Sequence, residues 1–137
     1  MSAISELIRV ESDGSISFGD YTLAAKAKKD NFEYKGDLYK VKTCKEITKL
    51  EKNGSFVYES VPGTTAIGFV ETGDGVKFTV SGNEDAQVTL GLEDGATYEV
   101  QINGEDAGVI ETNLGGKLTL GVELSAGEDV AVIVKRK

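Results

Sequence analysis

The stretch VKFTVSGNEDAQVTLGLEDGATYEV, residues 76–100, decides the fold class of the chain. Apolar and polar residues alternate at 76–80, again at 88–92, and once more from Tyr98 onward. Such alternation places one face of a strand on a core and the other face in water. Asp94-Gly95 separates two of these runs, and this residue pair accepts the positive φ of a tight hairpin turn. The stretch therefore predicts short antiparallel strands.

The same pattern extends beyond this stretch. Alternation recurs at 118–124 and 130–134, and the pairs Asp74-Gly75, Asn103-Gly104 and Gly115-Gly116 also predict hairpin turns. About five to seven strands at steps of roughly 8–14 residues are typical of an antiparallel β-sandwich or a jelly-roll-like sheet. We expect this architecture for the part of the chain after Pro62.

The first part of the chain is also predicted to be mostly β. Its expected hairpins are 4–11 with 15–18 around Asp13-Gly14, 31–35 with 37–43 around Lys35-Gly36, and 46–52 with 55–60 around Asn53-Gly54. The segment YTLAAKAKKD at 21–30 contains alanines and lysines, which favour a helix. No apolar stripe at helical spacing supports a helix there, so a strand or extended chain is preferred to a short helix.

A change in composition near Pro62 predicts two structural halves. Residues 1–62 contain ten basic and ten acidic residues, whereas 63–137 contain five and thirteen, for net charges of 0 and −8. Glycine is divided in the same sense, with 4 before the boundary and 13 after it. We expect a lysine-rich N-terminal β subdomain at 1–62 and an acidic C-terminal sandwich at 63–137. Two sheets of one fold would produce the same pattern.

Length and charge limit the classes of partner. A chain of 137 residues fits one average domain with a real core. Its net charge of −8 argues against nucleic acid and membrane surfaces as partners, because both attract clustered Lys and Arg. The first residues lack the pattern of a signal peptide, which predicts a cytoplasmic protein. The single cysteine, Cys44, excludes an intramolecular disulfide.

The chain contains no histidine, which removes most catalytic arrangements. Histidine is the commonest general base and zinc ligand, and nucleophilic serine or cysteine usually needs it. We therefore expect no enzyme activity, no cofactor, and no catalytic or metal-binding residues. The acidic segments 71–75 and 103–108 do not have the spacing of a calcium loop. Acids in turns are expected to be solvated, namely Asp74, Glu93, Asp94, Glu105, Asp106, Glu128 and Asp129.

The aromatic residues and Cys44 each allow two interpretations. The chain has no tryptophan, the usual sugar-binding platform. Phe56, Tyr58, Phe78 and Tyr98 fit the alternating core pattern, whereas Tyr34, Tyr39 and Tyr58 form either core contacts or a partly exposed ligand patch. Cys44 has Lys42 and Lys45 nearby, which favours a thiolate. With no histidine or second thiol beside it in the sequence, a structural role is preferred.

Lysines are concentrated in residues 26–52. They are Lys26, Lys28, Lys29, Lys35, Lys40, Lys42, Lys45, Lys49 and Lys52. One interpretation is a solvated face whose lysines protect an edge strand. The other sets this basic surface against the acidic second half of another copy, which would produce a homo-oligomer.

Two runs of the sequence carry a resemblance to known proteins. They are GDLYKVKTCKEITKLEKNGSFVYESVPGT at 36–64 and EDAQVTLGLEDGATYEVQINGEDAGVIETNLGGKLTLGVEL at 84–124. The chain resembles small proteins of anaerobic Firmicutes labelled "endosialidase", which implies a bacterial, cytoplasmic, stand-alone protein. Sialidases hold their substrate with an arginine cluster, and this chain has only Arg9 and Arg136. No catalytic residue is therefore carried over, and the residues do not support the label. The second run is similar to β-sandwich modules appended to polysaccharide-processing enzymes.

These observations predict a non-enzymatic structural or assembly protein that acts through self-association or contacts with another protein. The alternative is a β-sandwich module that binds a glycan or another small ligand. A hydrolase that uses carboxylates alone is a third hypothesis, and it requires two acids in one concave pocket.

Overall fold

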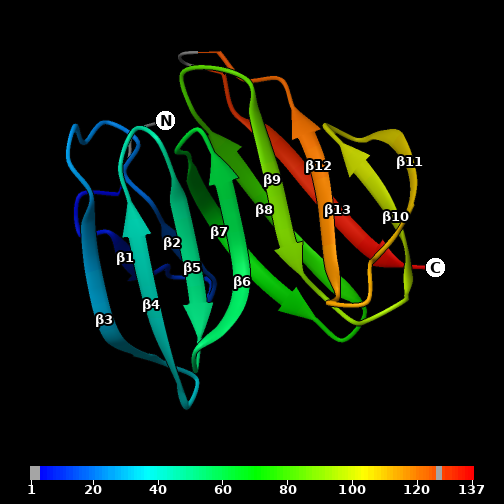
Figure 1. Ribbon diagram of the computed structural model, residues 1–137, viewed down its shortest axis with the longest axis horizontal. Helices are drawn as coiled ribbons and strands as arrows, with labels where there is room; N and C mark the ends of the chain where they lie inside the picture. Colours follow the sequence, from blue (N-terminus) through cyan, green and yellow to red (C-terminus); the bar gives the residue numbers. More distant parts are fainter. Residues whose placement is uncertain (1–3, 126–127) are drawn as a thin grey trace.

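The computed structural model describes residues 4–125 and 128–137, and these residues form thirteen β-strands (Figure 1). The strands are β1 (Ile8–Val10), β2 (Ile16–Phe18), β3 (Ala27–Tyr34), β4 (Asp37–Thr43), β5 (Thr48–Lys52), β6 (Ser55–Val61), β7 (Thr65–Thr72), β8 (Gly75–Ser81), β9 (Ala86–Gly91), β10 (Thr97–Ile102), β11 (Glu105–Glu111), β12 (Lys117–Val122) and β13 (Val130–Arg136). In this part of the chain, no helix has the length and apolar character needed to cross a membrane.

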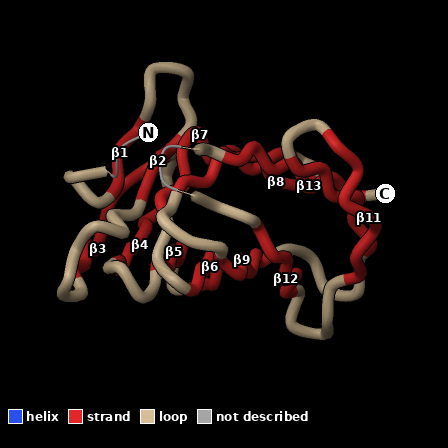
Figure 2. The backbone as a smooth tube through the Cα atoms, turned by 90° about the horizontal axis from the view of Figure 1, so that it is seen from above, coloured by secondary structure: helices blue, strands red, loops and turns tan. Residues whose placement is uncertain are grey.

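The strands form two antiparallel sheets. The first has seven strands in the order β1-β2-β7-β8-β13-β10-β11, and the second has six in the order β12-β9-β6-β5-β4-β3. Figure 2 shows the two sheets as separate layers, with β7, β8 and β13 in one and β4, β6 and β9 in the other. The predicted all-β, antiparallel sandwich is confirmed.

The core lies between the two sheets, as the alternation predicts. Four aromatic rings, those of Phe18, Tyr58, Phe69 and Phe78, pack together there with centroids 5.1–6.3 Å apart. Residues from the alternating runs after Pro62 are buried in the same core. They are Val76, Val80, Val88, Leu90, Tyr98, Val100, Leu118, Leu120, Val122, Leu124, Val130, Val132 and Val134. Leu92 and Ile102 are only half-buried at the margin of this core.

Pro62 lies where the chain passes from one sheet to the other, between β6 and β7. Strands from the two sides of this position pair directly, because β2 pairs with β7 and β6 pairs with β9. Residues from both sides also share one hydrophobic core. Each sheet is therefore built from both parts of the sequence.

Several of the predicted turns are confirmed as hairpins. Lys35-Gly36, Asn53-Gly54 and Asn103-Gly104 each have positive φ at both residues and join paired neighbouring strands. Asp13-Gly14 lies between the paired strands β1 and β2. The hairpin of β7 and β8 also forms, but Gly75 is already the first residue of β8.

Two predicted hairpins are wrong. Asp94-Gly95 connects β9 to β10, and Gly115-Gly116 connects β11 to β12, yet each pair of strands lies in two different sheets. Positive φ at Gly95 and Gly116 suits a corner between layers as well as a hairpin. A local turn signal does not specify which strand the chain will pair with next.

The remaining differences concern β3, β7 and β11. In the segment 21–30, residues 21–26 contain turns and bends and Ala27 begins β3, so no helix forms and the expected strand is confirmed only from Ala27 on. The sequence pattern did not predict β7, whose register shifts between Ile67 and Val70 around a positive-φ glycine. It also did not predict β11, an edge strand with little burial on either face. Strands that are irregular or exposed on both faces lose the alternation that identifies them.

Candidate functional site

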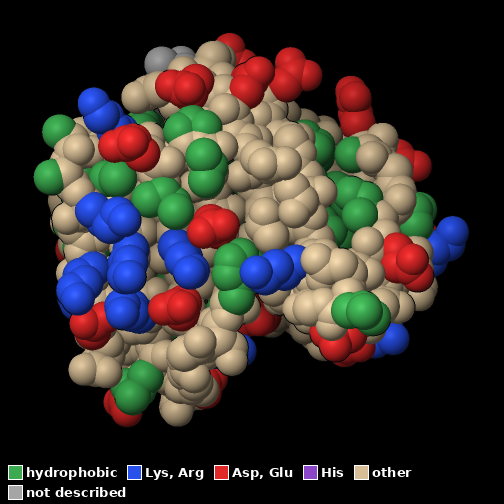
Figure 3. Space-filling model, viewed as in Figure 1, with side chains coloured by type: hydrophobic (Ala, Val, Ile, Leu, Met, Phe, Trp, Pro, Cys, Tyr) green, Lys and Arg blue, Asp and Glu red, His purple; other side chains and the backbone are tan. Residues whose placement is uncertain are grey.

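Lysines on three adjacent strands line up on the outer face of the six-stranded sheet. Strand β4 turns Lys42 outward because its neighbours Val41 and Thr43 are buried. The register places Lys42 directly opposite Lys28 on β3 and directly opposite Lys49 on β5. We call Lys28, Lys42 and Lys49 the lysine row. Figure 3 shows basic side chains gathered over these strands.

The charge of the lysine row is compensated only at one end. Lys49 has the carboxylate of Glu51 at 3.9 Å, and its cross-strand neighbour on β6 is Glu59. Within the described residues, the ammonium groups of Lys28 and Lys42 form no ion pair. Like charges directly opposite each other destabilise a sheet. The row is therefore a concentrated positive charge on a chain whose net charge is −8.

Protection of an edge strand accounts for part of this pattern. Strand β3 is an edge of its sheet, and Lys28, Lys29 and a bulge at Asn31 interrupt that edge. Such features prevent pairing with other chains. Lys42 and Lys49, however, lie on interior strands that are already paired on both sides. Edge protection therefore does not explain them.

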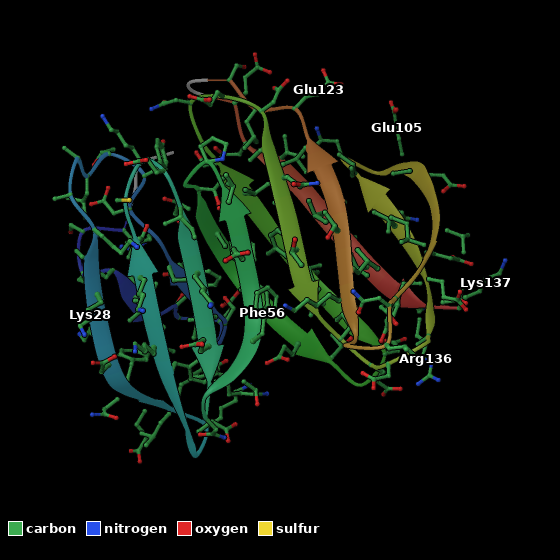
Figure 4. All side chains as sticks on the ribbon, in the orientation of Figure 1. Lys28, Phe56, Glu105, Glu123, Arg136 and Lys137 are labelled. Carbon is green, nitrogen blue, oxygen red and sulfur yellow. The ribbon has the colours of Figure 1, made fainter. Side chains whose placement is uncertain are left out.

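Phe56 extends the basic surface, and its expected place in the core is wrong. A β-bulge in β6 sets Leu50 opposite Tyr58 but Glu51 opposite Phe56, so one extra residue lies between. The bulge keeps Tyr58 in the core and turns Phe56 to the outer face. The Nζ of Lys117 lies 4.6 Å from the centroid of the Phe56 ring. Figure 4 labels Phe56 on this sheet. Three consecutive large apolar residues at 56–58 were the only sign of this irregularity.

The tyrosines of the lysine-rich part do not form an exposed patch. Tyr39 and Tyr58 are buried, and burial raises the pKa of each phenol to about 12. Tyr34 is half-buried, packs edge-on against Tyr39 at 5.7 Å, and donates a hydrogen bond to the carbonyl of Gly14. The alternative of core and cross-strand packing is therefore confirmed for Tyr39 and Tyr58. Phe78 and Tyr98 are buried as expected.

A chain of hydroxyl groups is buried beneath the crossing at Pro62. The hydroxyls of Tyr58 and Ser60 both contact that of Thr64, at 2.6 and 2.7 Å. The Thr48 hydroxyl donates to the Thr64 carbonyl and contacts Thr43 at 2.8 Å. No buried polar side-chain atom of the described residues lacks a hydrogen-bond partner. Each hydroxyl of this network has a partner, so the network ties β4, β5 and β6 to the connection that leads to β7.

The turn acids are all exposed, as predicted. Several bind their own turns: Asp74 accepts a hydrogen bond from the Thr72 hydroxyl, and Asp106 accepts one from Gly108 N–H. Glu93 pairs with Arg136. Where the chain is described, no three acidic or cysteine side chains are grouped as metal ligands.

Cys44 is buried and unpaired, which agrees with the structural interpretation. Its backbone N–H donates to the carbonyl of Ile47, and its own carbonyl lies against Gly63. A burial of this kind keeps the thiol from solvent-borne reagents.

Acidic side chains gather at one end of the molecule, opposite in sign to the lysine row. They lie on the loops that follow β8 and β12 and at the start of β11, and Figure 4 labels Glu105 and Glu123 among them. Figure 3 shows acidic groups along this margin and few basic ones. We call this surface the acidic end; its exposed members are Glu84, Asp85, Glu105, Asp106, Glu123, Glu128 and Asp129.

Comparison of the chain with protein-family models, with curated proteins and with solved structures gives no match.

Proposed function

We propose that the protein acts by assembling with other protein molecules, first of all with copies of itself, and not by catalysis. The observation that carries this proposal is the lysine row. Its members Lys42 and Lys49 set like charges opposite each other on interior strands, where they lower stability and protect no edge. An acidic partner would turn this unfavourable arrangement into a favourable one.

A second copy of the chain supplies such a partner. The lysine row cannot face another lysine row, because the two would repel each other. It complements the acidic end, which lies on a different part of the surface. The contact is therefore head-to-tail, and repetition of such a contact produces a ring or an open chain of copies. Electrostatic complementarity of this kind supports both rapid association and specificity.

The salt dependence of mass in solution tests this proposal. Light scattering should show assemblies in about 50 mM NaCl that dissociate in about 500 mM NaCl, because salt screens exposed charges. The double variant Lys28→Glu, Lys42→Glu should be monomeric in both. The matched control Lys77→Glu, Lys137→Glu makes the same change in net charge away from the row, and it should assemble like the wild type. A monomeric wild type at low salt, or assembly by the row variant, would contradict the proposal.

Mixing two defective variants tests the head-to-tail geometry. A Glu105→Gln, Glu123→Gln, Glu128→Gln variant weakens the acidic end and should not assemble alone. It still carries an intact lysine row, whereas the row variant still carries an intact acidic end. Mixed together, the two should form a discrete pair with one copy of each, because each supplies one working surface. Failure of the mixture to associate would contradict a head-to-tail contact.

A further inference from the structure

Three of the four edge strands of this protein carry features that prevent pairing with other chains. The edge strands are β1 and β11 of one sheet and β3 and β12 of the other. Strand β1 is only three residues long, and β3 carries lysines and a bulge. Strand β11 has acidic residues at both ends and a bulge that leaves Ala107 unpaired. Short length, charge and bulges are the usual protection of sheet edges.

The fourth edge strand, β12, is regular. It pairs with β9 from Lys117 to Val122 without any shift of register. Its charged residue, Lys117, stands at the first position, and the next two residues of the outer face are Thr119 and Gly121. Both are exposed. A regular edge without charge is a template on which another strand can pair.

The main chain of Thr119 and Gly121 points to the open side of β12. In an antiparallel pair, every second residue directs its N–H and C=O to the neighbouring strand. The carbonyl of Gly116 accepts a hydrogen bond from the N–H of Leu92, which follows β9, so Gly116 faces β9. Counting along the strand from Gly116, the residues that face away from β9 are Lys117, Thr119 and Gly121.

Only the first of these three residues is covered. The Asn113 side chain accepts a hydrogen bond from Lys117 N–H at 3.0 Å, and Asn113 N–H donates to the Lys117 carbonyl at 3.3 Å. In the described part of the chain, the main-chain groups of Thr119 and Gly121 form no hydrogen bond to a further loop or strand. The exposed surface of Gly121 is itself main chain. Donors and acceptors in strand geometry are therefore free on this edge.

We propose that this edge of β12 pairs with the same edge of a second copy, antiparallel and with the two-fold axis at Leu120. Thr119 of each copy would then lie opposite Gly121 of the other, so that the free main-chain groups of both copies bond to each other. The contact joins two six-stranded sheets into one continuous sheet.

Charge complementarity selects this register. An axis at Leu120 places Lys117 of each copy opposite Glu123 of the other, and opposite charges across a strand pair are favourable. Both side chains are exposed, and Figure 4 shows Glu123 beyond the end of β12. An axis at Thr119 would place Lys117 opposite Gly121, and an axis at Gly121 would place Glu123 opposite Thr119. The flexible Lys117 side chain, which lies over Phe56 in the single copy, can turn to the open side of the strand.

This contact is separate from the head-to-tail contact and does not rest on it. It uses main-chain hydrogen bonds of β12 and no member of the lysine row, although Glu123 also belongs to the acidic end. A single pair of short strands is marginal in water, so we expect a dissociation constant of about 1 mM. At the roughly 10 µM protein used for light scattering, the chain would remain almost wholly unpaired through this edge. The Lys28→Glu, Lys42→Glu variant is therefore still expected to scatter as a monomer.

Dilution of the ¹⁵N-labelled Lys28→Glu, Lys42→Glu variant tests this inference in about 50 mM NaCl, because the head-to-tail contact is removed there. Between about 2 mM and about 0.1 mM protein, the amide signals of Thr119 and Gly121 should move. The amide of Val109, on the protected edge strand β11, should not. Signals of Thr119 and Gly121 that stay fixed would overturn the inference and leave the edge to a strand of another protein. Failure of the assembly proposal would instead appear as assembly of this variant in light scattering.

Exchange of the two charges tests the register in the same background. Lys117→Glu alone and Glu123→Lys alone each place like charges opposite each other, and each should weaken pairing about tenfold. Mixed in equal amounts, the two variants place every glutamate opposite a lysine, so pairing should return to its original strength. Lys137→Glu is the control away from the edge and should not alter pairing. A mixture that pairs no better than its components, all with well-dispersed spectra, would overturn the inference.

Discussion

Lys42 on β4 lies directly opposite Lys49 on β5, on the outer face of an interior part of the six-stranded sheet. Lys28 on β3 lies opposite Lys42 on its other side. Adjacent strands are about 4.8 Å apart, so the backbone holds three ammonium-bearing side chains close together. Edge protection accounts for Lys28 but not for Lys42 and Lys49, and this arrangement is the observation on which the assembly proposal rests.

Reversal of the charge at Lys42, the central member of the lysine row, should stabilise the isolated chain. Lys42→Glu would replace two repulsive cross-strand neighbours by two attractive ones, and we expect a gain of about 0.5–1 kcal/mol in the free energy of unfolding. Urea unfolding of protein dilute enough to be monomeric, measured in about 50 mM and about 500 mM NaCl, checks this, because salt should reduce the gain. Lys77→Glu, the control outside the row, should not give the same salt-dependent gain. Destabilisation by Lys42→Glu would show that the row is not electrostatically strained.

Because of the bulge in β6, replacing Tyr58 and Phe56 by alanine should lower the free energy of unfolding by very different amounts. Tyr58→Ala empties a fully buried site and should cost about 3–5 kcal/mol. Phe56→Ala removes a half-buried ring and its contact with Lys117, and should cost about 1 kcal/mol. Denaturant unfolding of the two variants checks the difference. Equal costs would mean that Phe56 is a core residue after all.

Gly63 should tolerate no side chain. A Cβ at this position would lie 1.9 Å from the carbonyl oxygen of Cys44, and backbone cannot move aside easily. We expect Gly63→Ala to cost more than about 3 kcal/mol, or to prevent folding. Gly73→Ala is the matched control, since nothing lies near its Cβ, and it should change stability by less than about 0.5 kcal/mol. Thermal unfolding of both variants measures the contrast.

The buried phenol of Tyr58 predicts a loss of stability at high pH. Its pKa is raised by burial to about 12 in the folded protein, above the usual value near 10 that applies once the chain unfolds. The contribution of the neutral phenol is therefore complete below pH 10 and is lost as the pH rises to about 12. The largest loss from this group is about 2–3 kcal/mol.

Comparison with Tyr58→Phe isolates this effect. The variant loses the hydroxyl contact with Thr64, which should cost about 1 kcal/mol at neutral pH. Because phenylalanine does not ionise, the stability of the variant should approach and then exceed that of the wild type between pH 10 and 12. Urea midpoints across this range measure the gap. A stability difference between the wild type and Tyr58→Phe that stays constant over this pH range would contradict the raised pKa of Tyr58.

The fold could be predicted largely from local patterns. Alternation at 76–80 and 130–134 determined which side chains face the core, because successive residues of a strand point to opposite faces whatever the strand pairs with. Asn53-Gly54 and Asn103-Gly104 determined hairpins for a similar reason, since both residues of each pair accept positive φ. The concentration of lysine in one part of the chain and of acid in the other was likewise visible as composition.

Only the tertiary structure decided how these elements combine. Asp94-Gly95 and Gly115-Gly116 became corners between sheets, because the choice of pairing partner depends on long-range packing and not on the turn itself. One extra residue in β6 moved Phe56 from the core to the surface. The alignment of Lys28, Lys42 and Lys49 depends on the register of three strands. Register is set by contacts between segments distant in sequence, so the sequence alone determined the charges and the strands, and the packed sheets determined the surfaces they form.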